Sequence, residues 1–178
     1  VFADYLLSPR PDGVSLLGED RALTFTLGGL SKAAGLPQMK LAWIVASGPK
    51  DLLADALERL EVIADSYLSV STPVQLAAAG LLEMGRLVRA LIHARLRRNL
   101  NVIRHAVSIA PALTLYEPEG GWSIVLRVPA TVSGETLVLQ LLSEAGVLVH
   151  PGYFFDIEGD GFLVLSLLPH PDVFDEGL

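Results

Sequence analysis

Lys32 is the residue of this chain whose surroundings most clearly favour chemistry. It is one of three lysines, and it follows the glycine pair Gly28-Gly29 and a serine, Ser31. The two residues after it are alanines, whose small side chains let another group approach the amine closely. In apolar surroundings a lysine amine becomes less basic and can attack a carbonyl carbon. The segment therefore predicts covalent chemistry between Lys32 and a carbonyl compound.

Other interpretations of Lys32 stay open at this point. A nucleotide-binding phosphate loop needs a glycine directly before its lysine, whereas Ser31 stands there, and the chain has no G-x-G-x-x-G fingerprint. A hydrolytic Ser–Lys dyad does not need adjacent residues, so the adjacency of Ser31 and Lys32 supports it only weakly. A solvated surface lysine is the ordinary alternative.

Two strands are predicted to hold Lys32 in place. Residues 23–27 alternate threonine with apolar side chains, and residues 41–46 form a nearly continuous apolar run, as in a strand buried on both faces. Residues 28–40 between them are predicted to form a turn. A helix is expected from Pro49 to about Tyr67, because proline favours the first helical position and the leucines that follow recur at helical spacing.

A further boundary lies at "SVSTPVQ", where Thr72 before Pro73 predicts the start of a helix. Gly85 is expected to end or kink this helix. Residues 86–109 predict a long helix, which Pro111 stops. The helical part of the chain therefore ends near residue 110, and strand-helix material of α/β type lies before that point.

The pattern changes after Pro111. Short strands around Gly-rich turns are predicted within 113–129, 147–152 and 161–169, and another helix is predicted to begin near residue 172. Ser133 is a favourable N-cap for a helix to about Ala145, with Gly146 as its C-terminal signal. Residues 111–178 are therefore expected to form a smaller α+β unit.

Composition excludes several classes of function. The 178 residues carry a net charge of −7, which argues against nucleic acid as a partner. The four histidines lack metal-site spacing, so no metal is expected. No run reaches the ~18 apolar residues of a membrane span. The absence of cysteine leaves the compartment open, and we expect the cytoplasm.

The chain is unusually apolar. Its mean hydropathy is +0.48, and 51% of its residues are hydrophobic. A polar-shelled monomer of this size should be less apolar, so the excess predicts an interface. The interface would belong either to an obligate oligomer or to the remainder of a larger protein. An alanine- and leucine-rich composition bias is the alternative.

The stretch "LSKAAGLPQMKLAW" resembles the lysine segment of fold-type I pyridoxal-phosphate (PLP) enzymes, the aspartate aminotransferase superfamily, class I/II. The resemblance implies that Lys32 forms a Schiff base with the cofactor and that Ser31 binds its phosphate. Lys40 falls where the family usually has a phosphate-binding arginine, and Trp43 matches the tryptophan of the same segment. The implied cofactor is pyridoxal 5'-phosphate.

The resemblance covers nearly the whole chain, including "SVSTPVQ", "GVLVHPGYFF" and "GFLVLSLLPHPDVFDEGL". It implies an α/β fold in which residues 1–110 are the C-terminal part of the large domain, with a mostly parallel sheet and the long interdomain helix. Residues 111–178 would be the small α+β domain. The opening "VF" resembles the end of the family's D-E-V-[YF] segment. We therefore expect a C-terminal fragment of an aminotransferase-like protein that does not catalyse turnover alone.

Departures from the family pattern affect the anion contacts. Gly29 stands in place of the first serine of S-x-S-K, and Lys40 lacks the bidentate geometry of arginine. Phe2 occupies the place of a tyrosine that contacts the cofactor's 3-oxygen. Val164 occupies the place of the arginine that grips the substrate carboxylate in many members. Arg127, in an apolar strand, is the candidate to replace it, and a solvent-facing charge is the alternative.

The resemblance implies amino-group transfer between an amino acid and a 2-oxo acid, by a protein that acts as a homodimer. Two alternatives stay open. One is a PLP-dependent C–S or α,β-eliminating lyase on the same fold. The other is a non-catalytic aminotransferase-like regulatory domain.

Overall fold

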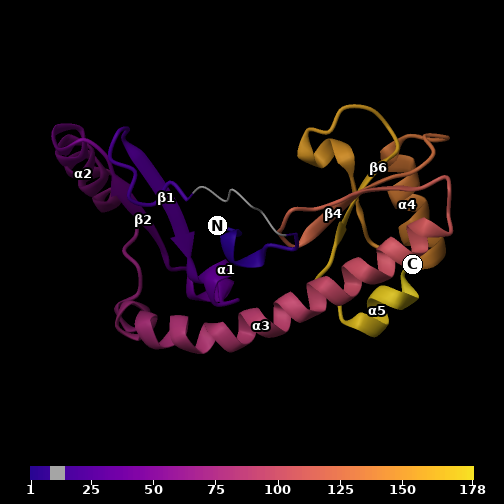
Figure 1. The fold of residues 1–178 in the computed structure, drawn as a ribbon, viewed down its shortest axis with the longest axis horizontal. Helices are drawn as coiled ribbons and strands as arrows, with labels where there is room; N and C mark the ends of the chain where they lie inside the picture. Colours follow the sequence, from indigo (N-terminus) through magenta and orange to yellow (C-terminus); the bar gives the residue numbers. More distant parts are fainter. Residues whose placement is uncertain (9–14) are drawn as a thin grey trace. The chain divides into compact units, whose positions relative to one another are not determined.

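The computed structural model describes residues 1–8 and 15–178 (Figure 1). The described residues form two compact units. One comprises residues 1–4 and 15–90, and the other comprises residues 5–8 and 91–178. The boundary between the units, at residues 90 and 91, falls within one long helix, and the predicted domain division after residue 110 stays a prediction. Within the described residues, no helix combines the length and the apolar character that a membrane crossing requires.

The first unit is built on a pair of antiparallel strands, β1 (Thr24–Gly29) and β2 (Ala42–Ser47). A short helix, α1 (Leu30–Ala33), and a 3₁₀ turn, η2 (Pro37–Met39), connect them. Helix α2 (Lys50–Asp65) follows β2, close to the predicted range. The connection, residues 30–41, reverses the chain direction, so that β2 runs antiparallel to β1.

The strands differ from the prediction in two respects. β1 continues through Gly28 and Gly29, which pair with Trp43 and Ala42, although a turn was predicted to start there. Ile44 and Val45 of β2 are 49% and 40% exposed, so the predicted burial of this strand on both faces is wrong for this chain. The apolar residues of β2 indicate a strand suited to burial, but the described residues leave part of it exposed.

Helix α3 (Thr72–Ser108) is 37 residues long and begins at the predicted residue. The predicted interruption at Gly85 is wrong, since the helix passes through it unbroken (Figure 1). Gly85 is instead a point of close packing. A Cβ added to it would lie 2.6 Å from the Cβ of Ala34 and 2.7 Å from the Cα of Ala34. The glycine therefore serves the contact between α3 and the segment that carries Lys32.

The second unit contains a four-stranded antiparallel sheet in the order β3-β4-β6-β5. Its strands are β3 (Thr114–Tyr116), β4 (Ser123–Arg127), β5 (His150–Pro151) and β6 (Phe162–Ser166). The helices are α4 (Gly134–Ala145), the 3₁₀ helix η3 (Gly152–Phe155) and α5 (Pro171–Glu176). A short 3₁₀ helix, η1 (Ala3–Tyr5), lies near the start of the chain.

The predicted caps of α4 are confirmed. The Ser133 hydroxyl accepts a hydrogen bond from the backbone N–H of Thr136 at 3.2 Å. Gly146 ends the helix with φ +69°, the left-handed conformation that glycine adopts without strain. The order of strands and helices agrees with the predicted α/β organisation. Both sheets among the described residues are antiparallel, so the mostly parallel sheet expected within residues 1–110 is not found there.

One face of the second half of α3 forms the core of the second unit. Leu96, Leu100 and Ile103 recur at helical spacing and are fully buried against Ile124 and Leu167. A polar residue, Asn99, is buried on the same helix. Its Nδ2 donates to the carbonyl oxygens of Leu167 and Pro169, both at 3.0 Å. These bonds tie the segment after β6 to α3, because buried carbonyls need a donor.

Asn99→Ala should lower the free energy of unfolding by about 2–4 kcal/mol. The change leaves the carbonyls of Leu167 and Pro169 buried without their donor. Urea unfolding followed by circular dichroism measures the effect. Asn101→Ala is the matched control, because Asn101 is exposed on the same helix and should change stability little. Equal effects of the two substitutions would contradict the role of Asn99.

A pair of glycine substitutions in α3 tests the close packing of Gly85. Gly80→Ala should stabilise the chain by about 1 kcal/mol, since its Cβ meets nothing within 4 Å and alanine favours the helix. Gly85→Ala should destabilise it by about 1–3 kcal/mol, because the new methyl would overlap Ala34. Thermal unfolding of both variants compares the signs, and stabilisation by both would mean that α3 and α1 are not in contact.

Candidate active site

Lys32 lines a pocket of about 740 Å³ in the first unit. The pocket is bordered by β1, α1 and β2, the three elements that the sequence places around the lysine. Ser31 lines the same pocket, and its expected contact with a cofactor phosphate stays a prediction. The remaining lining residues are Val1, Leu27, Gly28, Gly29, Ala42, Trp43, Ile44 and Tyr67.

Local packing of α1 turns Ser31 and Lys32 toward the pocket. Leu30 and Ala34, four residues apart on one helical face, are fully buried. The backbone N–H of Leu30 donates to the carbonyl of Leu41 at 3.0 Å, which fixes the start of the helix against the beginning of β2. Ser31 and Lys32 are only half-buried. The buried face therefore anchors α1 and leaves the two polar side chains at the pocket wall.

Phe2 lies beside the lysine amine. Lys32 Nζ is over the Phe2 ring, 5.4 Å from its centroid, in the range of a cation–π contact. The ring is 42% exposed, so it covers the amine from one side without closing the pocket. The structure thus brings together three of the residues that the sequence singled out, Phe2, Ser31 and Lys32.

Trp43 occupies space that only a glycine at position 28 leaves open. A Cβ on Gly28 would lie 2.3 Å from the indole Nε1 of Trp43. Gly28 and Trp43 are directly opposite each other in the β1–β2 register. Gly28 therefore leaves the space in which the indole lies at the pocket wall. The sequence predicted a turn at these glycines, because the pairing of Gly28 with Trp43 across the sheet cannot be recognised from the sequence alone.

Arg89 of α3 is a site residue that sequence reasoning did not single out. Its Nη1 donates to the backbone carbonyl of Ala33, the neighbour of Lys32, at 2.8 Å. The same nitrogen contacts Oδ2 of Asp4 at 3.3 Å. In the sequence Arg89 belongs to a run of arginines along one helix, and its spacing alone does not distinguish it from the others.

Lys40 lies apart from the Lys32 pocket. It lines a second pocket of about 490 Å³, with Gln38, Met39, Val74 and residues 68–71. Its backbone is left-handed, with φ +50°, which is uncommon for a residue other than glycine. The structure therefore does not place Lys40 at the same pocket wall as Ser31. The expected contact of Lys40 with a cofactor phosphate stays a prediction.

Arg127 belongs to the second unit, where it ends β4 as an exposed side chain. Its guanidinium carbon is 5.8 Å from the centroid of the Phe162 ring. Val164, at the position where many family members have arginine, is buried in β6 between Val125 and His150. The role of Arg127 in holding a substrate carboxylate stays a prediction.

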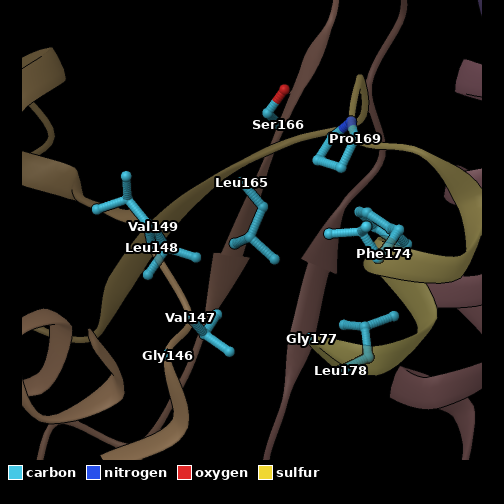
Figure 2. Close-up of a pocket in the computed structure, with 11 residues that line it drawn as sticks. Gly146, Val147, Leu148, Val149, Leu165, Ser166, Pro169, Phe174, Gly177 and Leu178 are labelled. Carbon is cyan, nitrogen blue, oxygen red and sulfur yellow. The ribbon is translucent and has the colours of Figure 1, made fainter. Parts of the chain in front are cut away.

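The second unit has its own pocket of about 290 Å³, between the segment after α4, the end of β6, and α5. Figure 2 shows its apolar walls, including Val147, Leu165, Phe174 and Leu178. None of the described residues that line it has a charged side chain. The Lys32 pocket, which combines an amine with a hydroxyl, is therefore the candidate active site.

Three ion pairs of the described residues have shifted pKa values: the exposed pair Glu19–Arg21 lies in the first unit outside the Lys32 pocket, and two others lie in the second unit. Hydrogen bonds from Arg104 lower the pKa of the Glu117 carboxyl. Hydrogen bonds from Arg98 lower the pKa of the Asp175 carboxyl and tie α5 to α3. These residues are not part of the Lys32 pocket, so their shifts indicate structural pairs rather than a reacting centre.

Comparisons with known proteins identify the family to which the chain is similar. The sequence profile of the family described as aminotransferase class I and II matches residues 2–171. Glutamate-pyruvate aminotransferase AlaA of Haemophilus influenzae is 26% identical over 162 residues, which cover 88% of this chain and 40% of that protein. Capreomycidine synthase of Streptomyces vinaceus is 33% identical over 158 residues, which cover 86% of this chain and 38% of that protein.

Among solved structures, an aminotransferase from Escherichia coli has the same fold over 99% of this chain and 45% of its own length. The TM-score is 0.80 at 19% identity. The chain thus spans about two fifths of the length of the curated relatives it matches. Because the family profile extends over nearly all of its residues, the chain belongs to the aminotransferase class I and II family.

Proposed function

We propose that the whole protein is a PLP-dependent aminotransferase in which Lys32 binds the aldehyde of pyridoxal 5'-phosphate. The observation that carries the proposal is the shared pocket of Lys32 and Ser31, which Trp43 also lines, with the Phe2 ring beside the Lys32 amine. Family membership supports the same reaction class. The relatives named glutamate-pyruvate and alanine aminotransferases support amino acids and 2-oxo acids as substrates.

The residues of the pocket fit a phosphorylated aromatic aldehyde. The Lys32 amine is the nucleophile that an aldehyde requires, and the Ser31 hydroxyl can donate to a phosphate oxygen. The indole of Trp43 provides a flat aromatic wall, which Gly28 admits by lacking a side chain. Lys40 would add a positive charge near the phosphate, although it lines a neighbouring pocket.

Each of these side chains has a distinct task. Pyridoxal phosphate supplies an electron sink that stabilises negative charge at the substrate Cα. Lys32 would hold the aldehyde of the bound cofactor, and its amine, when free, would be able to accept a proton from the substrate Cα and to donate it again. The Phe2 ring keeps water from one side of that amine. Ser31 orients the phosphate end.

A second candidate reaction is supported by the synthase relative. Capreomycidine synthase is 33% identical to this chain, and its name does not describe amino-group transfer. The same lysine chemistry also supports elimination, so a PLP-dependent lyase is the alternative within the proposed cofactor class. Incubation of the whole protein with amino acids and pyruvate, followed by product analysis, separates amino-group transfer, which converts pyruvate to alanine, from elimination, which releases ammonia.

We also propose a cytoplasmic homodimer. Four apolar side chains that lie on one face of α3 are 68–83% exposed: Leu76, Met84, Leu87 and Leu91. An apolar helical stripe of this kind supports an interface, because soluble monomers seldom expose such a row.

Lys32→Ala should abolish covalent binding of PLP by the whole protein, because the attacking amine is removed. After borohydride reduction, peptide mapping should find the adduct on Lys32 in the unmodified protein and no adduct in the variant. Lys50→Ala is the control, since Lys50 is an exposed residue at the start of α2 and should leave the adduct unchanged. An adduct on Lys40 or Lys50 in place of Lys32 would overturn the assignment.

Gly28→Ala should weaken PLP binding by about tenfold or more, because its methyl displaces the Trp43 indole from the pocket wall. Equilibrium titration with PLP measures the affinity. Gly80→Ala, a glycine substitution with open space around it, is the matched control and should bind PLP normally. Unchanged affinity in Gly28→Ala would show that the seat of Trp43 does not shape the cofactor pocket.

A further inference from the structure

A single guanidinium nitrogen links three segments of the first unit. Nη1 of Arg89, on α3, donates to the carbonyl of Ala33 at 2.8 Å and contacts the carboxylate of Asp4 at 3.3 Å. Ala33 is adjacent to Lys32 and ends α1. Asp4 lies two residues after Phe2, in the segment whose ring contacts the Lys32 amine. Arg89 therefore contacts the residue next to Lys32, and it also contacts the short segment that carries Phe2.

Burial distinguishes this arrangement from an ordinary surface ion pair. The Arg89 side chain is 26% exposed, whereas the side chains of the neighbouring pair Arg86 and Glu83 are both 68% exposed. A partly buried arginine that donates to a carbonyl is held in one conformation by its neighbours, and exposed pairs contribute little. Arg89 is therefore suited to fix the distance between two backbone segments.

The position of Arg89 on α3 reinforces this effect. Gly85, one helical turn earlier, lets α3 approach the backbone of Ala34. The close packing at Gly85 and the hydrogen bond at Ala33 act on consecutive residues of the segment that follows Lys32. The segment is thereby fixed at two adjacent points, so that α1 cannot rotate and carry the amine away from the pocket.

We propose that Arg89 is a positioning residue for Lys32, which holds the lysine amine against the Phe2 ring by tying α1 and the segment of Asp4 to the same guanidinium. The consequence of this positioning for PLP binding rests on the proposed function. The positioning itself concerns only residues of this chain, and it is measurable without cofactor.

Reductive ¹³C-methylation of the chain's three lysines tests the positioning directly. The NMR signal of a dimethylated lysine amine shifts when an aromatic ring lies beside it. The chemical shift of the Lys32 signal should therefore differ from those of Lys40 and Lys50, and we call this difference the displacement. The signal that Lys32→Arg removes is that of Lys32. Phe2→Leu should remove this shift difference, and the change between the two proteins gives the size of the effect of the ring. Arg89→Ala should also remove it, while the signals of Lys40 and Lys50 stay unchanged.

Further variants separate positioning from general stability. Arg89→Lys should retain part of the displacement, because an ammonium group can still donate to the Ala33 carbonyl. Arg86→Ala, which breaks an exposed pair one turn away on α3, should leave the Lys32 signal unchanged. Asp4→Ala keeps the contact with Ala33 and cuts only the link to the Phe2 segment. It should reduce the displacement in a folded chain even where Arg89→Ala is too unstable to measure.

The outcome that overturns the proposal is a Lys32 signal that stays at its original position in both Arg89→Ala and Asp4→Ala. Titration of the whole protein with PLP then tests the consequence, with an expected loss of about tenfold in affinity for Arg89→Ala. If the unmodified protein binds no PLP, the proposed function fails. The NMR comparison still decides whether Arg89 positions Lys32.

Discussion

The contact between α3 and the segment after Lys32 is the constraint on which the candidate site depends. Gly85 brings the helix to the Cβ of Ala34, and this approach is closer than any larger residue would permit. Ala34 is buried at this contact, Leu30 is buried on the same face of α1, and Ser31 and Lys32 are left at the pocket wall. The position of the reactive amine thus depends on close packing between apolar groups, to which the hydrogen bond from Arg89 to Ala33 adds.

Much of the site was predictable from the sequence because its chemistry is local. Ser31 and Lys32 are adjacent, and the strands that flank them have recognisable apolar patterns. The roles of Gly28 and Gly85 were not predictable. A glycine signals a turn or a helix end in a single sequence, whereas here each glycine makes room for a residue distant along the chain, Trp43 or Ala34.

Exposure was also beyond the reach of pattern analysis. The run in β2 indicates a strand that buries both faces, yet Ile44 and Val45 remain exposed. Arg89 illustrates the same difficulty for charges. Its sequence neighbours on α3 resemble it in type, and only the contacts with Asp4 and Ala33 separate it from a solvated arginine. Residue type indicates which interactions a side chain can make, and the tertiary contacts decide which of several similar residues makes them.

The left-handed backbone of Lys40 restricts which substitutions that position tolerates. A β-branched residue at φ +50° would be strained by roughly 1–2 kcal/mol, whereas glycine or asparagine adopts this conformation readily. Arginine would carry the same backbone strain as lysine, because the strain arises at the Cβ and the guanidinium group at the end of the side chain does not reduce it. Variation at residue 40 is therefore filtered by backbone geometry before charge is considered, and a neutral asparagine is sterically easier to accommodate there than a charged replacement.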